Sequence, residues 1–427
     1  MSNNTRQFQS RWKKLLTLPP ALRYRDYRNY WFGTLASVTG FQMFQFGQLW
    51  LIYELTESPL FLGYVGLAQA IPAIVLNLVG GVVADRFNRR ILILSTQILN
   101  AALIAILATL TLLDQVEVWH VLTIAFCSGA VNAFDQPARQ AIYPTLITPS
   151  VMTSAVALNS AIWQGVRIVA PALAGFIISA AGTSTVFYLG STGFVMMAVV
   201  MIRLNVPPSK ERPSTSPFKD LAQGLKFIKD NFIFTFLIGM TFFNSFFGMS
   251  YMTMMPVFAV DILKVGAEGQ GQLLSLSGLG ALLITLFLGS RSNLGHEGLR
   301  VIGGAVLFGI TVATFAVTSQ FVGSFPLALT LMFIVGVCSS IYMIAIMTSL
   351  QLMVPDNMRG RVMGFYSMTW SILPLGGMQA GAIANAIGAH WALVIGGTAV
   401  VLFALGPALL NHQVRNLTSL VNQFKTK

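Results

Sequence analysis

The segment that decides this fold is Gly80-Gly81-Val82-Val83-Ala84-Asp85-Arg86-Phe87-Asn88-Arg89-Arg90. It lies between two apolar stretches that are each long enough to cross a bilayer as a helix. Four charged residues fall within its last six positions, although only 9% of the chain is charged. The glycines permit a tight turn, and so dense a charge cluster requires contact with water. The segment is therefore predicted to be a short charged loop at a membrane surface, where a gate would lie.

The composition of the whole chain is that of a membrane protein. Hydrophobic residues make up 55% and the mean hydropathy is +0.71, whereas a globular protein is roughly 25% charged. The predicted fold class is an all-α membrane protein with twelve transmembrane helices in two six-helix pseudo-symmetric halves. The twelve apolar stretches are 29–53, 60–84, 91–113, 119–141, 153–180, 185–204, 231–259, 269–290, 299–318, 326–350, 362–387 and 391–411.

The basic residues predict the orientation of these spans. Apart from Lys264 and Arg167, every lysine and arginine lies either before the first span or in or next to the segment that follows an even-numbered span. The positive-inside rule then places both termini in the cytoplasm. The net charge of +12 is explained by this topology, so we expect no nucleic-acid partner. The polar segment 1–28 has no early apolar run and predicts no signal peptide.

The chain divides into five parts by hydropathy. A cytoplasmic N-terminal segment (1–28) precedes an N-terminal six-helix half (29–204), a proline-rich cytoplasmic linker (205–230), a C-terminal six-helix half (231–411) and a cytoplasmic tail (412–427). The halves share local pattern, because Pro149 and Gly175 recur 206 positions later as Pro355 and Gly381. An internal repeat with a site between its halves is a recurring plan of transporters. Asp85 has only Asn293 as its counterpart, which predicts an asymmetric inner gate.

The opening segment also resembles a known signature. Gly81 to Arg90 fits G-x-x-x-D-R-x-G-R-R, the signature of the major facilitator superfamily, with Asn88 in place of a glycine. The runs Ala133–Ala141 (AFDQPARQA) and Met358–Gly364 (MRGRVMG) are similar to those of the bacterial efflux branch that contains the enterobactin exporter. Arg167–Gly175 (RIVAPALAG) is similar in part to an exporter-associated G-P-x-x-G-G element, with Ala170 and Ala174 replacing glycines. The resemblance covers essentially the whole chain.

This resemblance implies a secondary transporter of the bacterial inner membrane that works by alternating access. It implies export of an amphipathic small molecule such as a siderophore or drug, driven by proton entry. The residues that it assigns to gating are Gly81, Asp85, Arg86, Arg89, Arg90, Asp135 and Arg139. We expect one of the arginines of the 80–90 segment to pair with Asp135 while the inner side is closed; anchoring to anionic lipid is the alternative for these arginines.

Polar residues inside the spans are candidates for substrate binding or coupling. Arg167 is the one basic residue well inside a span, and such a charge faces a cavity or an acidic partner. Gln42, Gln45 and Gln48 follow one another in steps of three along one helical face. The full set of candidates is Gln42, Gln45, Gln48, Arg167, Asn159, Asn244 and Gln379. Hydrogen bonding between helices is the alternative role for each of them. Pro171, with Gly175 one turn later, is a candidate helix bend.

The sequence offers two candidates for a proton-carrying group and no motif for metal or ATP binding. Asp135 is the first candidate for a proton-carrying group and Glu54 the second. The cysteines and histidines have no metal-ligand spacing, and no G-x-x-x-x-G-K-[ST] motif for ATP is present. We therefore expect a monomer with no cofactor, no metal and no enzymatic activity. The alternatives are an uptake permease or lysolipid flippase of the same fold, a non-transporting membrane sensor, and a membrane enzyme, for which clustered catalytic residues are missing.

Overall fold

The computed structural model describes residues 19–204, 217–290 and 296–425, and this part of the chain is almost entirely helical, with no strand. Six long helices come first: α2 (Arg25–Thr56), α3 (Pro59–Arg86), α4 (Arg89–Leu112), α5 (Val118–Ile142), α6 (Met152–Ala181) and α7 (Thr183–Arg203). Short helices surround them: η1 (Pro20–Arg23), η2 (Tyr143–Leu146), η3 (Pro149–Val151) and the amphipathic α8 (Pro217–Asp230).

The second part of the chain repeats this pattern with two interruptions. Its elements are α9 (Phe232–Phe246), η4 (Gly248–Ser250), α10 (Tyr251–Val257), the π-helical η5 (Phe258–Ile262), α11 (Gly266–Gly289), α12 (Glu297–Phe321), α13 (Phe325–Met353), α14 (Asp356–Trp370), α15 (Leu373–Ile387), α16 (Ala389–Leu410), α17 (His412–Arg415) and α18 (Leu417–Lys425). Thus the stretches 231–259 and 362–387 are broken helices. Pro374 lies in the first turn of α15, directly after one break, and Pro256 lies inside α10, just before the π-helical η5. At each of them a missing backbone N–H removes a helical hydrogen bond.

Nine segments of the described chain are long and apolar enough to cross a membrane. Each coincides with an apolar stretch expected from the sequence. The remaining expected stretches correspond to α2, α5 and the broken pair α14–α15, which carry more polar residues than the other long helices.

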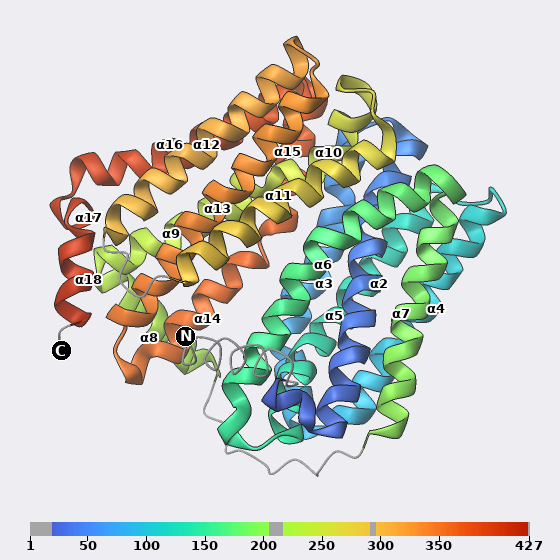
Figure 1. The fold of residues 1–427 in the computed structure, drawn as a ribbon, viewed down its shortest axis with the longest axis horizontal. Coiled ribbons are helices and arrows are strands. Elements are labelled where there is room, and N and C mark those ends of the chain that lie inside the picture. Colours follow the sequence, from blue (N-terminus) through green and yellow to red (C-terminus); the bar gives the residue numbers. More distant parts are fainter. Residues whose placement is uncertain (1–18, 205–216, 291–295, 426–427) are drawn as a thin grey trace, which may run out of the picture.

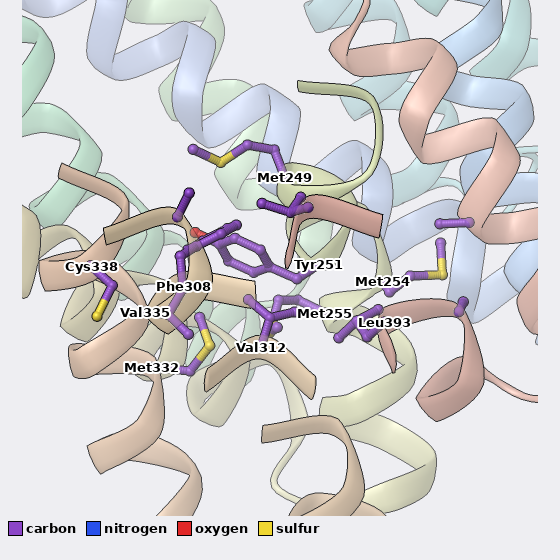
Figure 2. Close-up of a cluster of buried hydrophobic side chains, with 14 of the residues drawn as sticks. Met249, Tyr251, Met254, Met255, Phe308, Val312, Met332, Val335, Cys338 and Leu393 are labelled. Atoms are coloured by element: carbon purple, nitrogen blue, oxygen red, sulfur yellow. The ribbon is translucent and has the colours of Figure 1, made fainter. Parts of the chain in front are cut away.

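Figure 1 shows the helices in two groups. In the N-terminal group, α2 packs on α6 and α7, α3 on α5, and α4 on α5 and α7. In the C-terminal group, α11 packs on α13, α12 on α13 and α16, and α15 on α16. The C-terminal group has a dense apolar core, in which Figure 2 shows side chains from several helices turned toward one another: Tyr251, Met254, Met255, Phe308, Val312, Met332 and Val335.

The two ends of the molecule differ in the length of their turns. We refer to the end at which α2 turns into α3 as the α2–α3 end, and to the opposite one as the α3–α4 end. Each of the six turns at the α2–α3 end is short and contains a residue with positive φ: Glu57, Asp114, Gly182, Lys264, Gly323 and Gly388. The longer connections, including 204–216 and 290–296, are at the α3–α4 end.

The two groups touch where α3 meets α15 and where α6 meets α11. Glycines make both contacts close. A Cβ on Gly381 of α15 would lie 2.6 Å from the carbonyl oxygen of Pro59 on α3, and one on Gly175 of α6 would lie 2.3 Å from that of Ala267 on α11. All four residues lie near the α2–α3 end. The backbones therefore approach too closely there for any side chain at Gly175 or Gly381.

Replacement of Gly175 by alanine should weaken this contact. The new methyl group would force α6 and α11 apart, and overpacking of this kind costs about 1–3 kcal/mol. We expect a lower thermal midpoint for Gly175→Ala in detergent, measured by tryptophan fluorescence. Gly165→Ala on the same helix is the matched control, because no atom lies within 4 Å of that Cβ position. Equal midpoints for the two variants would contradict the assignment.

Candidate functional site

A cavity of about 580 Å³ lies between the two helix groups. Both groups contribute to its wall: α2, α3, α5 and α6 on one side, and η4, α10, α11, α14 and α15 on the other. The lining residues come from the middle of the long helices, so the cavity lies midway between the two ends. Its volume is within the range of drug-sized ligand sites.

The two walls of the cavity differ in chemistry. The N-terminal group contributes most of the polar side chains: Gln42, Gln45, Gln69, Asn132 and Arg167. The C-terminal group contributes mainly apolar ones, with Thr253, Gln270 and Ser371 as exceptions: Met249, Met252, Leu274, Trp370, Leu373 and Pro374. Arg167 is the one charged residue among the described residues that line the cavity. The cavity is therefore amphipathic, with its positive charge on one wall.

Three glutamines form a hydrogen-bonded chain beside the cavity. Gln45 Nε2 donates to Gln69 Oε1 (3.0 Å), Gln69 Nε2 donates to Gln48 Oε1 (2.8 Å), and Gln48 Nε2 donates to the Val121 carbonyl (3.2 Å). Gln45 and Gln69 line the cavity, whereas Gln48 is fully buried. The chain joins α2 to α3 and α5. Gln48 therefore serves packing, and Gln42 and Gln45 face the space between the groups.

A second, smaller cavity of about 260 Å³ continues from the first toward the α3–α4 end. The two share Phe41, Asn132 and Trp163 as lining residues. Among the further residues of the smaller cavity are Asp135 and Arg139, from successive turns of α5. The cavities together extend from the middle of the molecule into the N-terminal group.

Asp135 and Arg139 form a buried ion pair. Arg139 Nε donates to Asp135 Oδ2 at 2.5 Å, and the two residues are 8% and 3% exposed. Thr96 Oγ1 and Gln97 Nε2 of α4 donate to Asp135 Oδ1 at 2.7 and 2.8 Å. Arg139 Nη2 donates to Ser37 Oγ of α2 at 2.9 Å. The pair thereby connects three helices, and a change in the charge of Asp135 would affect all three.

The pairing of Asp135 with an arginine of the 80–90 segment, expected while the inner side is closed, stays a prediction. Asp135 does not pair with Arg89 or Arg90 in the described structure, because Arg139 lies one helical turn away on α5 and occupies it. Arg89 Nη1 donates to the Ala141 carbonyl at 3.1 Å. Arg90 Nε donates to the Met201 carbonyl at 2.7 Å, at the end of α7. Both arginines bind backbone of their own group.

Parts of the expected gate lie outside the described residues. Gly81 lies within α3, but the side chains of Asp85 and Arg86 are not described, and Asn293, the counterpart of Asp85 in the second half, is not described either. Nothing in the structure bears on the interactions of these three side chains.

The remaining candidates are dispersed. Asn159 lines the smaller cavity. Asn244 is fully buried in the C-terminal group, where its Nδ2 lies 3.7 Å from Met343 Sδ. Gln379, on α15, lines neither cavity. Pro171 lies inside α6 and lines the larger cavity, and Gly175 makes the close contact with α11.

Several contributors to the site were not expected from the sequence. Gln69, Gln270 and Trp163 line the larger cavity, and Thr96 and Gln97 bind Asp135. A polar residue inside an apolar stretch was the available signal for Gln69, Gln97 and Gln270. At the α2–α3 end, the Tyr53 hydroxyl donates to the carboxylate of Asp261, and this bond connects α2 of one group to η5 of the other.

Known proteins resemble this chain over most of its length. Residues 17–425 match the family described as transmembrane secretion effector. A staphyloferrin A transporter of Staphylococcus aureus is 23% identical over 87% of this chain and 92% of its own length. Macrolide efflux protein A of Streptococcus pyogenes is 23% identical over 91% and 96%. The multidrug efflux pump Tap of Mycolicibacterium fortuitum is 23% identical over 80% and 85%.

Solved structures share the fold. A bacterial homologue of the human lysosomal transporter Spinster, in an inward-facing and occupied conformation, superposes with a TM-score of 0.68 over 94% of this chain and 97% of its own, at 14% identity. The same homologue in an unoccupied conformation gives 0.66. The profile match, the relatives and the fold agree: the chain is a multi-pass membrane protein that belongs to the transmembrane secretion effector family of major facilitator superfamily transporters.

Proposed function

We propose that this protein is a secondary transporter that exports an amphipathic small molecule from the bacterial cytoplasm by alternating access. The observation that carries this proposal is the cavity between the two groups. It is lined by both groups, the groups touch near the α2–α3 end, and the cavity continues toward the α3–α4 end through residues shared with the smaller cavity. A site that both halves line, closed on one side, is what a rocking transporter requires.

Twelve membrane crossings fit the helices better than nine. The expected spans that are less apolar are α2, α5 and α14–α15, and these contribute Gln42, Asn132, Ser371 and other polar residues to the cavities. A helix that lines an aqueous cavity needs an apolar surface only where it meets lipid or other helices. The low hydropathy of these three is therefore the consequence of their position.

Pseudo-symmetry of two six-helix halves is supported by the contacts between the groups. Gly175 of the fifth span faces Ala267, at the start of the eighth; Gly381 of the eleventh span faces Pro59, at the start of the second. Both pairs connect positions that correspond in the two halves. The distribution of basic residues then assigns the α3–α4 end and both termini to the cytoplasm, so that the described conformation faces inward.

Two of the relatives are named for efflux. Their names favour export over uptake as the direction of transport. An uptake permease, a lysolipid flippase and a non-transporting sensor remain the competing functions, and one experiment separates them. The purified protein is reconstituted in liposomes with an imposed pH gradient, and flux is measured for a macrolide, a siderophore and a lysophospholipid. Flux of either of the first two in the direction opposite to the proton flow supports export, and flux in the same direction as the proton flow supports an uptake permease. Transfer of the lysolipid alone supports a flippase, and no flux at all supports a sensor.

Proton coupling is proposed for Asp135, because it is buried, faces a cavity and holds Arg139. Asp135→Asn should abolish the dependence of transport on an imposed pH gradient and lower the rate at least tenfold, since Arg139 loses its ionic partner. Removal of one partner from a buried pair costs about 3–5 kcal/mol, so the thermal midpoint of the variant is recorded in parallel. Asp26→Asn, at an exposed position of α2, is the control. Transport by Asp135→Asn with undiminished gradient dependence would exclude the proposal.

We further propose that the segment Gly81–Arg90, with Asp135 and Arg139, forms the inner gate. In the described conformation Arg89 and Arg90 bind carbonyl groups of their own helix group, as expected when the cytoplasmic side is open. Asp85→Ala should lower the transport rate at least tenfold at equal expression, because closure of the inner side would lose its acidic residue. Asp230→Ala, at an exposed position of α8, is the matched control. Normal transport by Asp85→Ala would rule out a gating role for this residue.

A further inference from the structure

Arg167 is a cation without a partner in the central cavity. It lies on α6, is partly buried and lines the larger cavity. Within the described part of the chain it makes no hydrogen bond and no ion pair. None of the described residues that line this cavity is acidic. An arginine in the middle of a membrane protein is costly unless an anion or water balances it, so the charge of Arg167 has to be balanced from outside the chain, by water or by the anion of a ligand.

The nearby acid cannot supply that charge. Asp135 belongs to the adjoining smaller cavity and accepts hydrogen bonds from Arg139, Thr96 and Gln97. Its negative charge is thus balanced by Arg139. The two arginines on the N-terminal wall therefore differ, because Arg139 has an ionic partner and Arg167 does not.

Two uncommitted amides accompany Arg167 on the cavity wall. The Gln42 side chain has no hydrogen-bond partner among the described residues, and the Oε1 atom of Gln270, a residue that is 1% exposed, has none either. They lie on α2 and α11, the two helices with the most extensive contacts to α6. Val38 and Phe46 of α2, Val166 and Ala170 of α6, and Ala267 of α11 belong to one buried cluster, which fixes the three helices against one another.

We propose that Arg167, with Gln42 and Gln270, forms an anion subsite that selects amphipathic carboxylates as ligands of the central cavity; this rests on the proposed transport function. A planar guanidinium binds a carboxylate through two parallel N–H donors, and the Nε2 groups of Gln42 and Gln270, rather than their Oε1 atoms, can donate further hydrogen bonds. The apolar body of the ligand then lies on the opposite wall, against Met249, Met252 and Trp370. A cationic amphiphile finds a like charge and no acid in this cavity and is disfavoured.

Ligand binding by the purified protein tests the subsite separately from transport. The probes are dansylglycine and its neutral amide, which differ in the carboxylate alone, and binding is measured by dansyl fluorescence excited through Trp163 and Trp370 of the cavity wall. The wild-type protein should bind dansylglycine at least tenfold more tightly than the amide. Arg167→Gln should lower the affinity for dansylglycine at least tenfold and leave that for the amide within twofold. Arg167→Lys should recover part of the loss.

Arg203→Gln is the control for the lost charge, because Arg203 is exposed at the end of α7, and its affinities should match the wild type. A thermal midpoint of Arg167→Gln near that of the wild type shows that the variant is folded; if it is lower, Arg167→Lys decides, since it keeps the charge. Equal affinity of the wild type for both probes, or an Arg167→Gln variant that still prefers the carboxylate, would overturn the subsite. Selective binding without flux of any probe would leave the subsite in place and contradict the transport function.

Discussion

The contact between backbones at the α2–α3 end is the constraint on which the rest of the structure depends. Gly175 against Ala267 and Gly381 against Pro59 bring helices from the two groups to a separation that no side chain permits. These contacts close one side of the central cavity and fix which residues of α3, α6, α11 and α15 face it. Close approach of small residues also supplies the packing that holds helices together in lipid, where the hydrophobic effect contributes little. Any conformation that faces the other way has to break both contacts.

Polar side chains also connect the two groups at this end, and one such bond runs from Ser58 Oγ to Asn385 Oδ1 at 3.5 Å. The hydrogen bond from the Tyr53 hydroxyl to the carboxylate of Asp261 joins α2 to η5 beside the short turns, where Tyr53 is buried and Asp261 is exposed. A hydrogen bond to a charged group contributes about 1.5–3 kcal/mol. The glycine contacts are dry, and their separation exposes backbone that has to be covered again. The two sets together close the α2–α3 end by close packing of backbones and by polar bonds between the two groups.

The sequence alone predicted where the long helices lie, but it did not predict which partners their polar residues have. Apolar length located the long helices, because lipid requires it. The steps of three from Gln42 to Gln48 predicted one face, but each step falls about 60° short of a full turn. Gln48 is therefore rotated away from the cavity and bonds to Val121. For Asp135 the sequence predicted an arginine of the 80–90 segment as partner when the inner side is closed, and it did not predict the pair with Arg139, four residues along the same helix, that the described conformation has. Either pairing satisfies a buried charge, so only the fold shows which one a given conformation uses.

The distribution of charge between the two groups gives the chain its asymmetry. Arg167, Asp135 and Arg139 all lie in the N-terminal group, whereas the C-terminal wall of the cavity is built largely from methionine, leucine and tryptophan. If the halves arose by duplication, polar chemistry was kept in one and adaptable apolar surface in the other. Methionine side chains conform to varied apolar shapes, so the C-terminal wall accommodates differences in the ligand body. The fixed positive charge of Arg167 on the N-terminal wall favours ligands that carry a negative charge. One cavity can then accept ligand bodies of varied shape and still select ligands by their charge, because the C-terminal half supplies the adaptable surface and the N-terminal half supplies the fixed charge.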